Sequence, residues 1–303
     1  MAEGLAAAGS SVPSFTPQWE AANCHLCRRR DDEPVLLHGR PLVTGQFGYE
    51  VHPVICRGCG LVYLNPRWTP AAFTEFYTRE YDALYRLETK PDYGIAGVRR
   101  HMEQVWERCR QHLHPTGIAT VLDVGCGSGH GLMVLREQMP AARFCGIEAS
   151  PDCRRVLAEE VGAELLDSDV DGPWVDSSQG RFDFIVLRHV MEHFLTPVET
   201  LRRLRSTLSP AGRMYLAMPD MMHPRTVLRD YDRWWEYWFR AVHPYYYCRE
   251  TLFATLDLAG LKPLAWGEDN EEIWCLAAMG GQESPLRADC FAGQRRLLEQ
   301  LLP

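Results

Sequence analysis

The sequence lacks an uninterrupted apolar run of the roughly 20 residues that a membrane-spanning helix requires. Its small and polar start, Met1 to Ser14, lacks the basic region that opens a secretory signal. A basic excess is also missing, because 32 Lys and Arg stand against 40 Asp and Glu, giving a net charge of −8. These absences disfavour a membrane protein, an exported protein and a protein that chiefly binds nucleic-acid phosphates. We expect a cytoplasmic protein whose residues 1–20 form a disordered tail.

Four of the eleven cysteines form two closely spaced pairs near the N-terminus. Cys24 and Cys27 make one Cys-x-x-Cys pair, and a second pair follows after a gap of 28 residues, made by Cys56 and Cys59. Without an export signal the thiols stay reduced, so the two pairs predict a tetrahedral four-cysteine zinc site rather than disulfides. The alternative is four cysteines that bind no metal. Three histidines are spare candidate ligands: His25, His38 and His52.

The predicted zinc module spans residues 21–95, and residues 40–51 within it are expected to form a hairpin arm. Between Ala21 and Ile95 there are nine basic and nine acidic residues, so the module is electrically neutral. Because binding to a phosphate backbone needs a basic patch, this balance favours a small-molecule substrate over a nucleic acid. The whole chain of 303 residues suffices for one substantial domain in addition to this module.

A β-branched and apolar run, Thr120 to Val124, leads into a turn with glycine at every second position. Glycine has no Cβ and tolerates positive φ, so a strand that passes through such a turn into a helix lets the backbone approach a ligand closely. A dinucleotide-binding turn would carry a third glycine where this chain has His130. The pattern Asp123-x-Gly-x-Gly-x-Gly129 instead resembles motif I of the class I S-adenosylmethionine (SAM)-dependent methyltransferases.

This resemblance implies a SAM site at the ends of the first three strands. It assigns five residues to the cofactor turn: Asp123, Gly125, Cys126, Gly127 and Gly129. Glu148, followed by Ala149, ends the predicted second strand, where a carboxylate accepts hydrogen bonds from ribose hydroxyls. Asp167 or Asp169, after the third strand, is expected at the adenine amino group. The alternatives are a turn without a ligand, a solvated Glu148 and an aspartate pair that only shapes its own turn.

Strand and helix patterns alternate from residue 96 to residue 280, as in an α/β domain. The run from Phe182 to Arg188 is almost entirely apolar, which is typical of a central parallel strand. The resemblance implies a Rossmann-like, seven-stranded core whose seventh strand is antiparallel. The expected strands are 120–124, 143–148, 164–166, 182–188, 213–218, 262–267 and 272–278. A C-terminal helix, Gln294 to Leu302, is expected within residues 281–303.

The fourth strand leads into Leu187-Arg-His-Val-Met-Glu-His-Phe194, at the sheet edge where α/β domains bind ligands. This segment resembles the Leu-Glu-His signature of the same methyltransferase group, with Met in place of Leu. Methyl transfer needs an aligned acceptor and a base for its proton, and Glu192 and His193 are adjacent candidates for that base. The structural alternative is that Glu192 caps the next helix and His193 packs below the cofactor. Arg188 and His189 are expected to line the cofactor pocket.

Nine of the seventeen residues from Tyr231 to Tyr247 are aromatic. Aromatic side chains with polar edges suit the walls of sugar sites, so residues 220–248 are expected to form a substrate lid. The alternative is a helix packed on the core or at a homodimer interface. His243, in a His-Pro-Tyr-Tyr-Tyr run that resembles the family's segment before its last helix, is a further candidate base or substrate contact.

The residues after the second cysteine pair extend the resemblance. Cys59-Gly-Leu-Val-Tyr-Leu-Asn-Pro66 and the later Phe76-Tyr77 are similar to methyltransferases of antibiotic-sugar and surface-polysaccharide pathways, which carry a small zinc domain. Four side chains are candidates either to reach over the SAM pocket or to form a packed linker: Tyr63, Asn65, Tyr77 and Tyr81. The resemblance implies SAM and Zn²⁺ as cofactors and a sugar, nucleotide sugar or secondary metabolite as the methyl acceptor.

The related deoxysugar C-methyltransferases continue for a further domain after the core, whereas this chain ends near the core. We therefore expect O-methylation at least as much as C-methylation. Two other functions stay open on this sequence. One is RNA methylation with the zinc module as the RNA-binding part, and the other is a non-catalytic SAM-binding scaffold.

Overall fold

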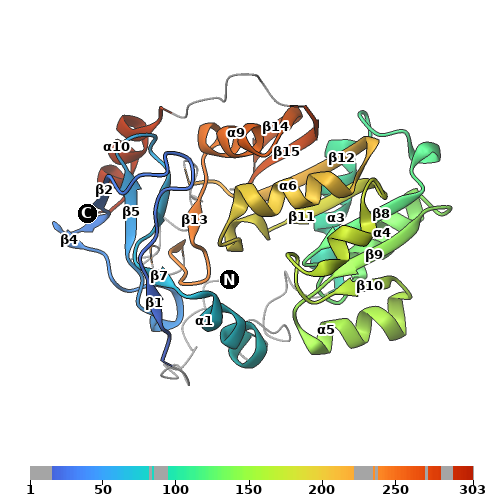
Figure 1. Cartoon of the computed structure of the whole chain (residues 1–303), viewed down its shortest axis with the longest axis horizontal. Coiled ribbons are helices and arrows are strands. Elements are labelled where there is room, and N and C mark those ends of the chain that lie inside the picture. Colours follow the sequence, from blue (N-terminus) through green and yellow to red (C-terminus); the bar gives the residue numbers. More distant parts are fainter. Residues whose placement is uncertain are drawn as a thin grey trace.

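The computed structural model describes residues 16–81, 84, 95–221, 235, 238–269, 272–280 and 289–302. Figure 1 shows a small module built from the N-terminal residues on one side and a larger α/β core on the other. No helix in the described ranges combines the length and the apolar character needed to cross a bilayer.

A sheet of seven strands forms the core. In spatial order the strands are β10 (Glu164–Asp167), β9 (Arg143–Ile147), β8 (Thr120–Val124), β11 (Phe182–Arg188), β12 (Leu208–Pro219), β15 (Glu272–Met279) and β14 (Leu261–Asp269). The pairs from β10 to β12 are parallel, and β15 runs antiparallel to both β12 and β14. The predicted Rossmann-like core with an antiparallel seventh strand is confirmed.

The side chains of β11 alternate between two layers of helices. Phe184 and Val186 pack with residues of α3 (Ile95–Cys109) and α4 (His130–Gln138) on one face of the sheet. Ile185 and Leu187 pack on the other face with residues of α6 (Pro197–Thr207) and α9 (Arg249–Leu258). Because these four side chains are fully buried, the carboxyl end of β11 is held rigidly between the two layers.

The remaining helices are short. They are α1 (Pro70–Glu75), α5 (Pro151–Val156), α6 (Pro197–Thr207), α9 (Arg249–Leu258), α10 (Phe291–Leu301), π-helical turns at Phe76–Glu80 and Leu157–Val161, and 3₁₀ turns at Gln46–Gly48, Pro115–Gly117, Pro173–Ser178 and Met191–His193. Thr69 and Ser150 cap α1 and α5 by accepting a hydrogen bond from a backbone N–H of the first turn, and proline follows each cap.

The N-terminal module is completed by segments from far along the chain. Its sheet has the order β13 (Tyr245–Tyr246), β6 (Val62–Leu64), β5 (Pro53–Cys56) and β2 (Asp32–Pro34). The first of these strands comes from the segment after β12, so the core contributes a strand to the module. Helix α10, from the C-terminal end of the chain, lies beside the N-terminal module. Figure 1 shows the helix in red next to the blue strands of the module.

Two short ladders complete the module, and one of them changes the predicted tail. Strand β1 (Trp19–Glu20) pairs with β7 (Arg67–Trp68), so the last two residues of the predicted disordered segment 1–20 are ordered. Residues 1–15 lie outside the described ranges. Within the predicted hairpin arm at residues 40–51, Thr44 and Glu50 form a single antiparallel bridge. A separate short ladder lies before it, in which β3 (Leu36–Leu37) pairs with β4 (Arg40–Pro41).

Candidate functional site

The glycine turn follows β8 and is packed on two sides. Its three glycines, Gly125, Gly127 and Gly129, have φ of 68°, 56° and 80°, the left-handed region that other residues avoid. A Cβ at Gly125 would lie 2.7 Å from a methyl group of Val190, and one at Gly129 would collide with Leu157. A Cβ at Gly127 would have no described atom within 4 Å. The turn is therefore open to a ligand at its middle glycine.

The carboxylate of Glu148 holds this turn. Its Oε2 accepts a hydrogen bond from the backbone N–H of Gly127 at 2.8 Å, and its Oε1 accepts one from Ser150 at 2.8 Å. Asp123 is buried nearby, and burial together with the charge of Glu148 raises its pKa to about 8. Cys126 is buried under the turn, and Ala149 is exposed beside Glu148.

These residues fit SAM on the chemistry of their donors and charges. A sulfonium and an ammonium group would reduce the repulsion between the two buried carboxylates. Carboxylate oxygens carry further lone pairs, so Glu148 can hold the turn and still accept from ribose hydroxyls. The open side of Gly127 provides room for the ligand chain.

The predicted adenine contacts both shape their own turn. Oδ1 of Asp167 accepts hydrogen bonds from the N–H groups of Ser168 at 2.7 Å and Asp169 at 3.2 Å. Oδ1 of Asp169 accepts from Asp171 at 2.9 Å. This arrangement matches the turn-forming alternative, and a role at the adenine stays a prediction for either aspartate.

The residues after β11 form a compact cluster next to the glycine turn. Val190 contacts the turn, and Glu192 and His193 follow in the 3₁₀ turn at residues 191–193. The ring of His193 lies 4.5 Å from that of His243, edge to face. One ligand atom each from Glu192, His193 and His243 lies within 4.8 Å of the other two. The three predicted catalytic side chains are thus brought together from two segments.

The module supplies a fourth side chain to this cluster. The hydroxyl of Tyr77, in the π-helical turn after α1, lies 2.7 Å from Nδ1 of His193. The same nitrogen lies 2.9 Å from the carbonyl oxygen of Val242. Of the four residues proposed to reach the pocket, Tyr63 and Asn65 instead bond Asp32 within the module. Tyr81 packs on Tyr77 with ring centroids 5.0 Å apart.

Burial sets the protonation of the cluster. It lowers the pKa of His193 and lowers that of His243 well below the usual range, so both rings are neutral near pH 7. Burial alone would raise the pKa of Glu192, but the neighbouring His189 outweighs it and the net shift is downward. His189 is desolvated too, yet Glu192 and Glu272 raise its pKa. The cluster therefore holds a carboxylate and two neutral imidazoles.

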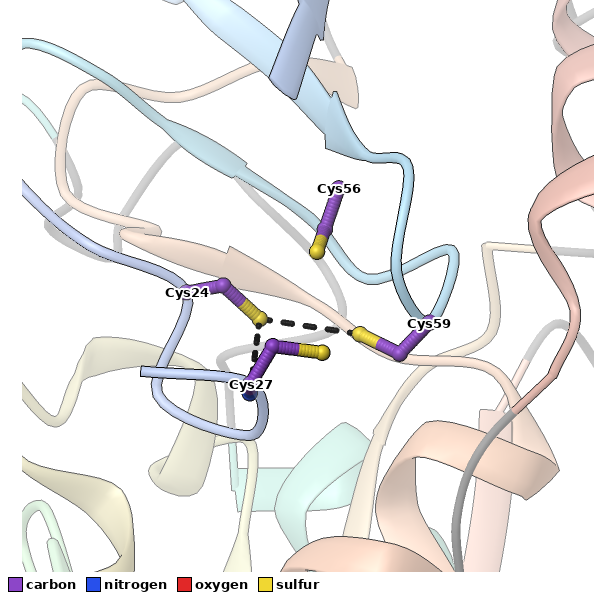
Figure 2. Close-up of side chains that lie close together, drawn as sticks. All are labelled: Cys24, Cys27, Cys56 and Cys59. Atoms are coloured by element: carbon purple, nitrogen blue, oxygen red, sulfur yellow. Dashed lines mark hydrogen bonds between the residues drawn. The ribbon is translucent and has the colours of Figure 1, made fainter. Parts of the chain in front are cut away.

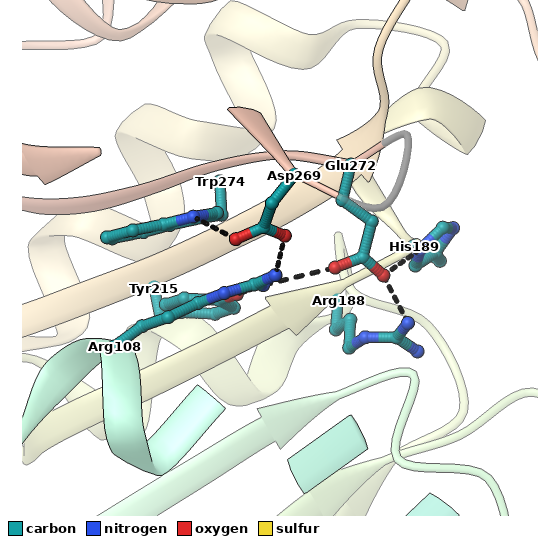
Figure 3. Close-up of polar contacts among 7 residues, drawn as sticks. All are labelled: Arg108, Arg188, His189, Tyr215, Asp269, Glu272 and Trp274. Carbon is teal, nitrogen blue, oxygen red and sulfur yellow. Dashed lines mark hydrogen bonds and ion pairs between the residues drawn. The ribbon is translucent and has the colours of Figure 1, made fainter. Parts of the chain in front are cut away.

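His189 joins this cluster to a partly buried ion network around Glu272 that sequence reasoning missed. Its φ is 54°, and the ring lies with Nε2 2.7 Å from Oε1 of Glu272 and Nδ1 3.4 Å from Oε1 of Glu192. Figure 3 shows Glu272 between Arg108 on one side and Arg188 and His189 on the other. Burial would raise the pKa of Glu272, but the three cations hold it well below its usual range.

The outer half of the network fixes helix α3 to the sheet. Arg108 pairs with Asp269 and donates a hydrogen bond to the hydroxyl of Tyr215 at 2.6 Å (Figure 3). Its guanidinium also lies over the ring of Trp274, 5.3 Å from the centroid. The only sequence signal for this network was an acidic residue, Glu272, at the start of an otherwise apolar strand. Arg188 and His189, predicted to line the cofactor pocket, contact Glu272 in this structure.

The four paired cysteines converge as the spacing predicts. Their sulfur atoms all lie within 4.8 Å of one another, and Sγ of Cys24 is 3.6 Å from Sγ of Cys59. Figure 2 shows the four side chains pointing toward one centre from two separate loops. Tetrahedral Zn–S bonds of about 2.3 Å place sulfurs about 3.8 Å apart, so this spacing fits zinc.

The spare histidines have other contacts. Nε2 of His25 lies 2.9 Å from the hydroxyl of Thr255 in α9, and its ring packs edge-on against Tyr245. Nε2 of His52 pairs with Glu50 at 2.8 Å. His38 sits in the hairpin turn with φ 50°.

The described part of the aromatic segment is buried. Tyr245 and Tyr246 form β13, while Trp238 and Phe239 pack with the residues of the module. These residues fit the alternative of a segment packed on the core, and they connect the module to the core. The rest of the predicted lid, residues 222–234 and 236–237, lies outside the described ranges.

Comparisons with known proteins agree with this geometry. Residues 97–265 match the family described as "Methyltransferase domain", and these residues are more than half of the chain. The tRNA U34 carboxymethyltransferase of Shewanella denitrificans is 33% identical over 119 residues, which are 37% of this chain and 34% of that protein. The enzyme of the same name from Shewanella piezotolerans is 30% identical over 146 residues, 44% of this chain and 43% of that protein. The chain thus spans less than half the length of these curated relatives.

The structure is similar to that of the mitomycin 7-O-methyltransferase MmcR. The TM-score is 0.53 at 17% identity, covering 69% of this chain and 60% of that protein, a likeness that shows the fold. The glycine turn with its two carboxylates, the sheet order and the family match lead to one assignment. This chain belongs to the class I SAM-dependent methyltransferases.

Proposed function

We propose that this protein transfers the methyl group of SAM to a small-molecule acceptor, a sugar, nucleotide sugar or secondary metabolite, at oxygen or carbon. The observation that carries the proposal is the cluster of Glu192, His193 and His243 beside the glycine turn. Polar groups at this position meet an acceptor at the carboxyl end of the parallel strands, where α/β domains bind ligands.

In this proposal the methyl donor SAM binds at the carboxyl ends of β8, β9 and β10. Glu148 would accept from the ribose hydroxyls, Asp123 would lie near the positive part of SAM, and Gly127 would leave space for its methionine chain. SAM supplies a methyl group on a sulfonium leaving group. The protein then has to align the acceptor, exclude water and accept the acceptor's proton.

Three side chains are candidates for the proton acceptor, because all three are unprotonated near pH 7. His193 and His243 are neutral near pH 7 and carry a lone pair, and Glu192 is ionised. As the acceptor's lone pair forms the new bond to the methyl carbon, the carbon–sulfur pair returns to sulfur. The acceptor's proton passes to the base, and S-adenosylhomocysteine remains.

We also propose that the four cysteines bind one structural Zn²⁺. The loop of Cys24 and Cys27 would be tied to the end of β5, which pairs with β6 and so with β13. Zinc would thereby stabilise the module that carries Tyr77 to the catalytic cluster.

RNA is the second candidate acceptor, because the curated relatives are named for action on tRNA. Two observations favour a small molecule over RNA. Tyr77 and His243 are too far apart in sequence for a matched stretch of 119 residues to include both, so the likeness does not cover the whole cluster. The net charge of −8 and the neutral module also show no overall excess of basic residues, which RNA binding favours.

The test is methyl transfer from radiolabelled SAM to separate pools of nucleotide sugars, phenolic and glycosidic metabolites, and total tRNA. Label in a small-molecule pool, lost in Glu192→Gln and retained in the exposed control Glu159→Gln, is expected. Label in tRNA alone would replace the first candidate with the second. Label in no pool, from protein shown to bind SAM, would favour a scaffold.

A further inference from the structure

We propose that Glu192, His193 and His243 bind a divalent transition-metal ion that holds the acceptor. The three side chains offer one carboxylate and two imidazoles with ligand atoms within 4.8 Å of one another. A carboxylate and two histidines are a common ligand set for Mn²⁺, Fe²⁺ and Co²⁺ when further positions are left for substrate. The site is separate from the four cysteines, whose sulfur ligands suit Zn²⁺.

Glu192 gives the first independent reason. Its side chain is almost completely buried, and neither carboxylate oxygen has a hydrogen-bond partner among the described residues. The neighbouring His189 is at ion-pair distance, 3.4 Å. A buried carboxylate without hydrogen bonds is costly. His189 compensates the charge from one side, and a cation at the site would supply ligand bonds that the two oxygens lack.

The surroundings of His193 give the second reason. The carbonyl oxygen of Val242 can only accept, so the 2.9 Å contact places the ring proton on Nδ1. The lone pair of the neutral ring is then on Nε2. Metal-bound histidines usually donate their other ring N–H to a carbonyl or carboxylate, which fixes the ring for the metal. Tyr77, 2.7 Å from the same Nδ1, fixes the ring further.

Glu192, like His193, is held by residues that lie behind it. His189 lies between Glu192 and Glu272, and Glu272 is held by Arg108 and Arg188. The network around Glu272 thus holds His189 in place, and His189 contacts the proposed metal ligand Glu192. Residues behind the ligands of metal sites act in the same way.

The role of this metal ion rests on the proposed methyl transfer. With the ion bound, Glu192, His193 and His243 would act as metal ligands and not as the base that accepts the proton. A bound ion lowers the pKa of an acceptor hydroxyl that coordinates it, so that the proton leaves to water. The acceptor oxygen then forms its bond to the methyl carbon, and the carbon–sulfur electron pair stays on sulfur. An acceptor with two neighbouring oxygens, as in a sugar diol, would fill two open metal positions.

The experiment is a titration of the purified full-length chain with Mn²⁺, without SAM or acceptor, read by the loss of the free-ion EPR signal. Mn²⁺ disfavours thiolates, so it reports on this site and not on the cysteines. We expect one ion per chain. Glu192→Gln and His243→Asn should each weaken binding at least about tenfold, because changes to outer partners alone cost 10–100-fold. The exposed control His112→Ala should bind as the parent does.

Two outcomes would overturn the metal site: no Mn²⁺ binding by the parent chain, or unchanged binding in both variants. Each variant's fold is checked by its affinity for SAM. Pulsed EPR of bound Mn²⁺ in the parent needs no variant and should show two imidazole nitrogens. Their absence would also overturn the site. Because the titration omits methyl transfer, an inactive enzyme that binds Mn²⁺ would refute the proposed function and not this site.

Discussion

Two clusters of candidate metal ligands lie in this molecule, and the chain builds them differently. The four cysteines come from two local pairs, each of which brings its own sulfurs together. Glu192 and His193 are adjacent, but His243 arrives from beyond β12, and Tyr77 arrives from the module. The first cluster is therefore visible in the spacing of one residue type, whereas the second depends on the tertiary fold.

The clusters also differ in what surrounds them. The cysteines lie in a small module that shares a core with segments from both ends of the chain. The second cluster lies against the central sheet and the partly buried ion network around Glu272. The comparison suggests that the first cluster determines whether the module folds, and the second determines what the folded protein does.

The largest expected effect tests the first half of this comparison. Cys24→Ser, or chelation of the metal, should unfold the module, because structural zinc contributes on the order of 10 kcal/mol to such folds. The buried Trp68 should become exposed, which tryptophan fluorescence during thermal unfolding would detect. Cys109→Ser, a buried cysteine outside the cluster, is the control. An unchanged melting profile of Cys24→Ser would mean that the cysteines have no structural metal.

The next effect concerns the support of the second cluster. Glu272→Gln would leave Arg108 and Arg188 without their shared carboxylate, at a cost of about 3–5 kcal/mol in the free energy of unfolding. The exposed control Glu107→Gln should change it by less than about 0.5 kcal/mol. Chemical denaturation would measure both, and equal stabilities would show that the network is dispensable.

The network also predicts a pH dependence. The pKa of Glu272 lies below its unfolded value of about 4.3, so its stabilising effect is present above that pH and is lost as pH falls toward the folded value. The difference in unfolding free energy between parent and Glu272→Gln should therefore shrink below about pH 4.

A third effect concerns the cofactor side. Asp123 holds a proton below its pKa of about 8, and positively charged SAM favours the ionised form, so binding releases a proton. SAM affinity should fall by up to about tenfold per pH unit as pH decreases below 8. Calorimetry in buffers with different ionisation enthalpies would count the proton. Asp123→Asn should abolish the release, and a parent affinity that is constant from pH 6 to 8 would refute this linkage.

The smallest effect tests the contact between the two halves of the molecule. Tyr77→Phe removes one hydrogen bond to His193, worth about 0.5–1.5 kcal/mol, so the rate of methyl transfer should fall severalfold. Affinity for SAM should not change. Tyr81→Phe, which keeps the ring packing on Tyr77, is the matched control. Equal rates for the two variants would separate the module from the chemistry.

The sequence predicts best what is local. The bounds of β8 and β11, the glycine turn and the cysteine pairs depend on residues close together in the chain, and each was found where it was predicted. Strand β13 could not be predicted, because a pair of tyrosines becomes a strand only when β6 presents an edge to it. The contact of α10 with the module has the same origin.

The candidate site divides in the same way. Glu192, His193 and His243 were chosen from motifs, and the fold brings them together, but their chemical roles stay predictions. The role of Glu272 could not be predicted, because its partners Arg108 and Arg188 lie on different elements. Charge pairing across a sheet leaves no pattern along the chain. The hydrogen bonds of Asp167 and Asp169 are short-range, yet the sequence alone fits both an adenine contact and a turn-forming pair.

The most direct test of the account is a calorimetric titration of SAM into the parent chain and into Gly127→Val. The account predicts that the parent binds one SAM and that a side chain on the open face of the turn abolishes binding. Gly162→Val is the control, because Gly162 has a similar φ of 65° and no described atom within 4 Å of its Cβ position, but it lies outside the turn. Absence of binding to the parent, or equal binding by Gly127→Val, would contradict the account.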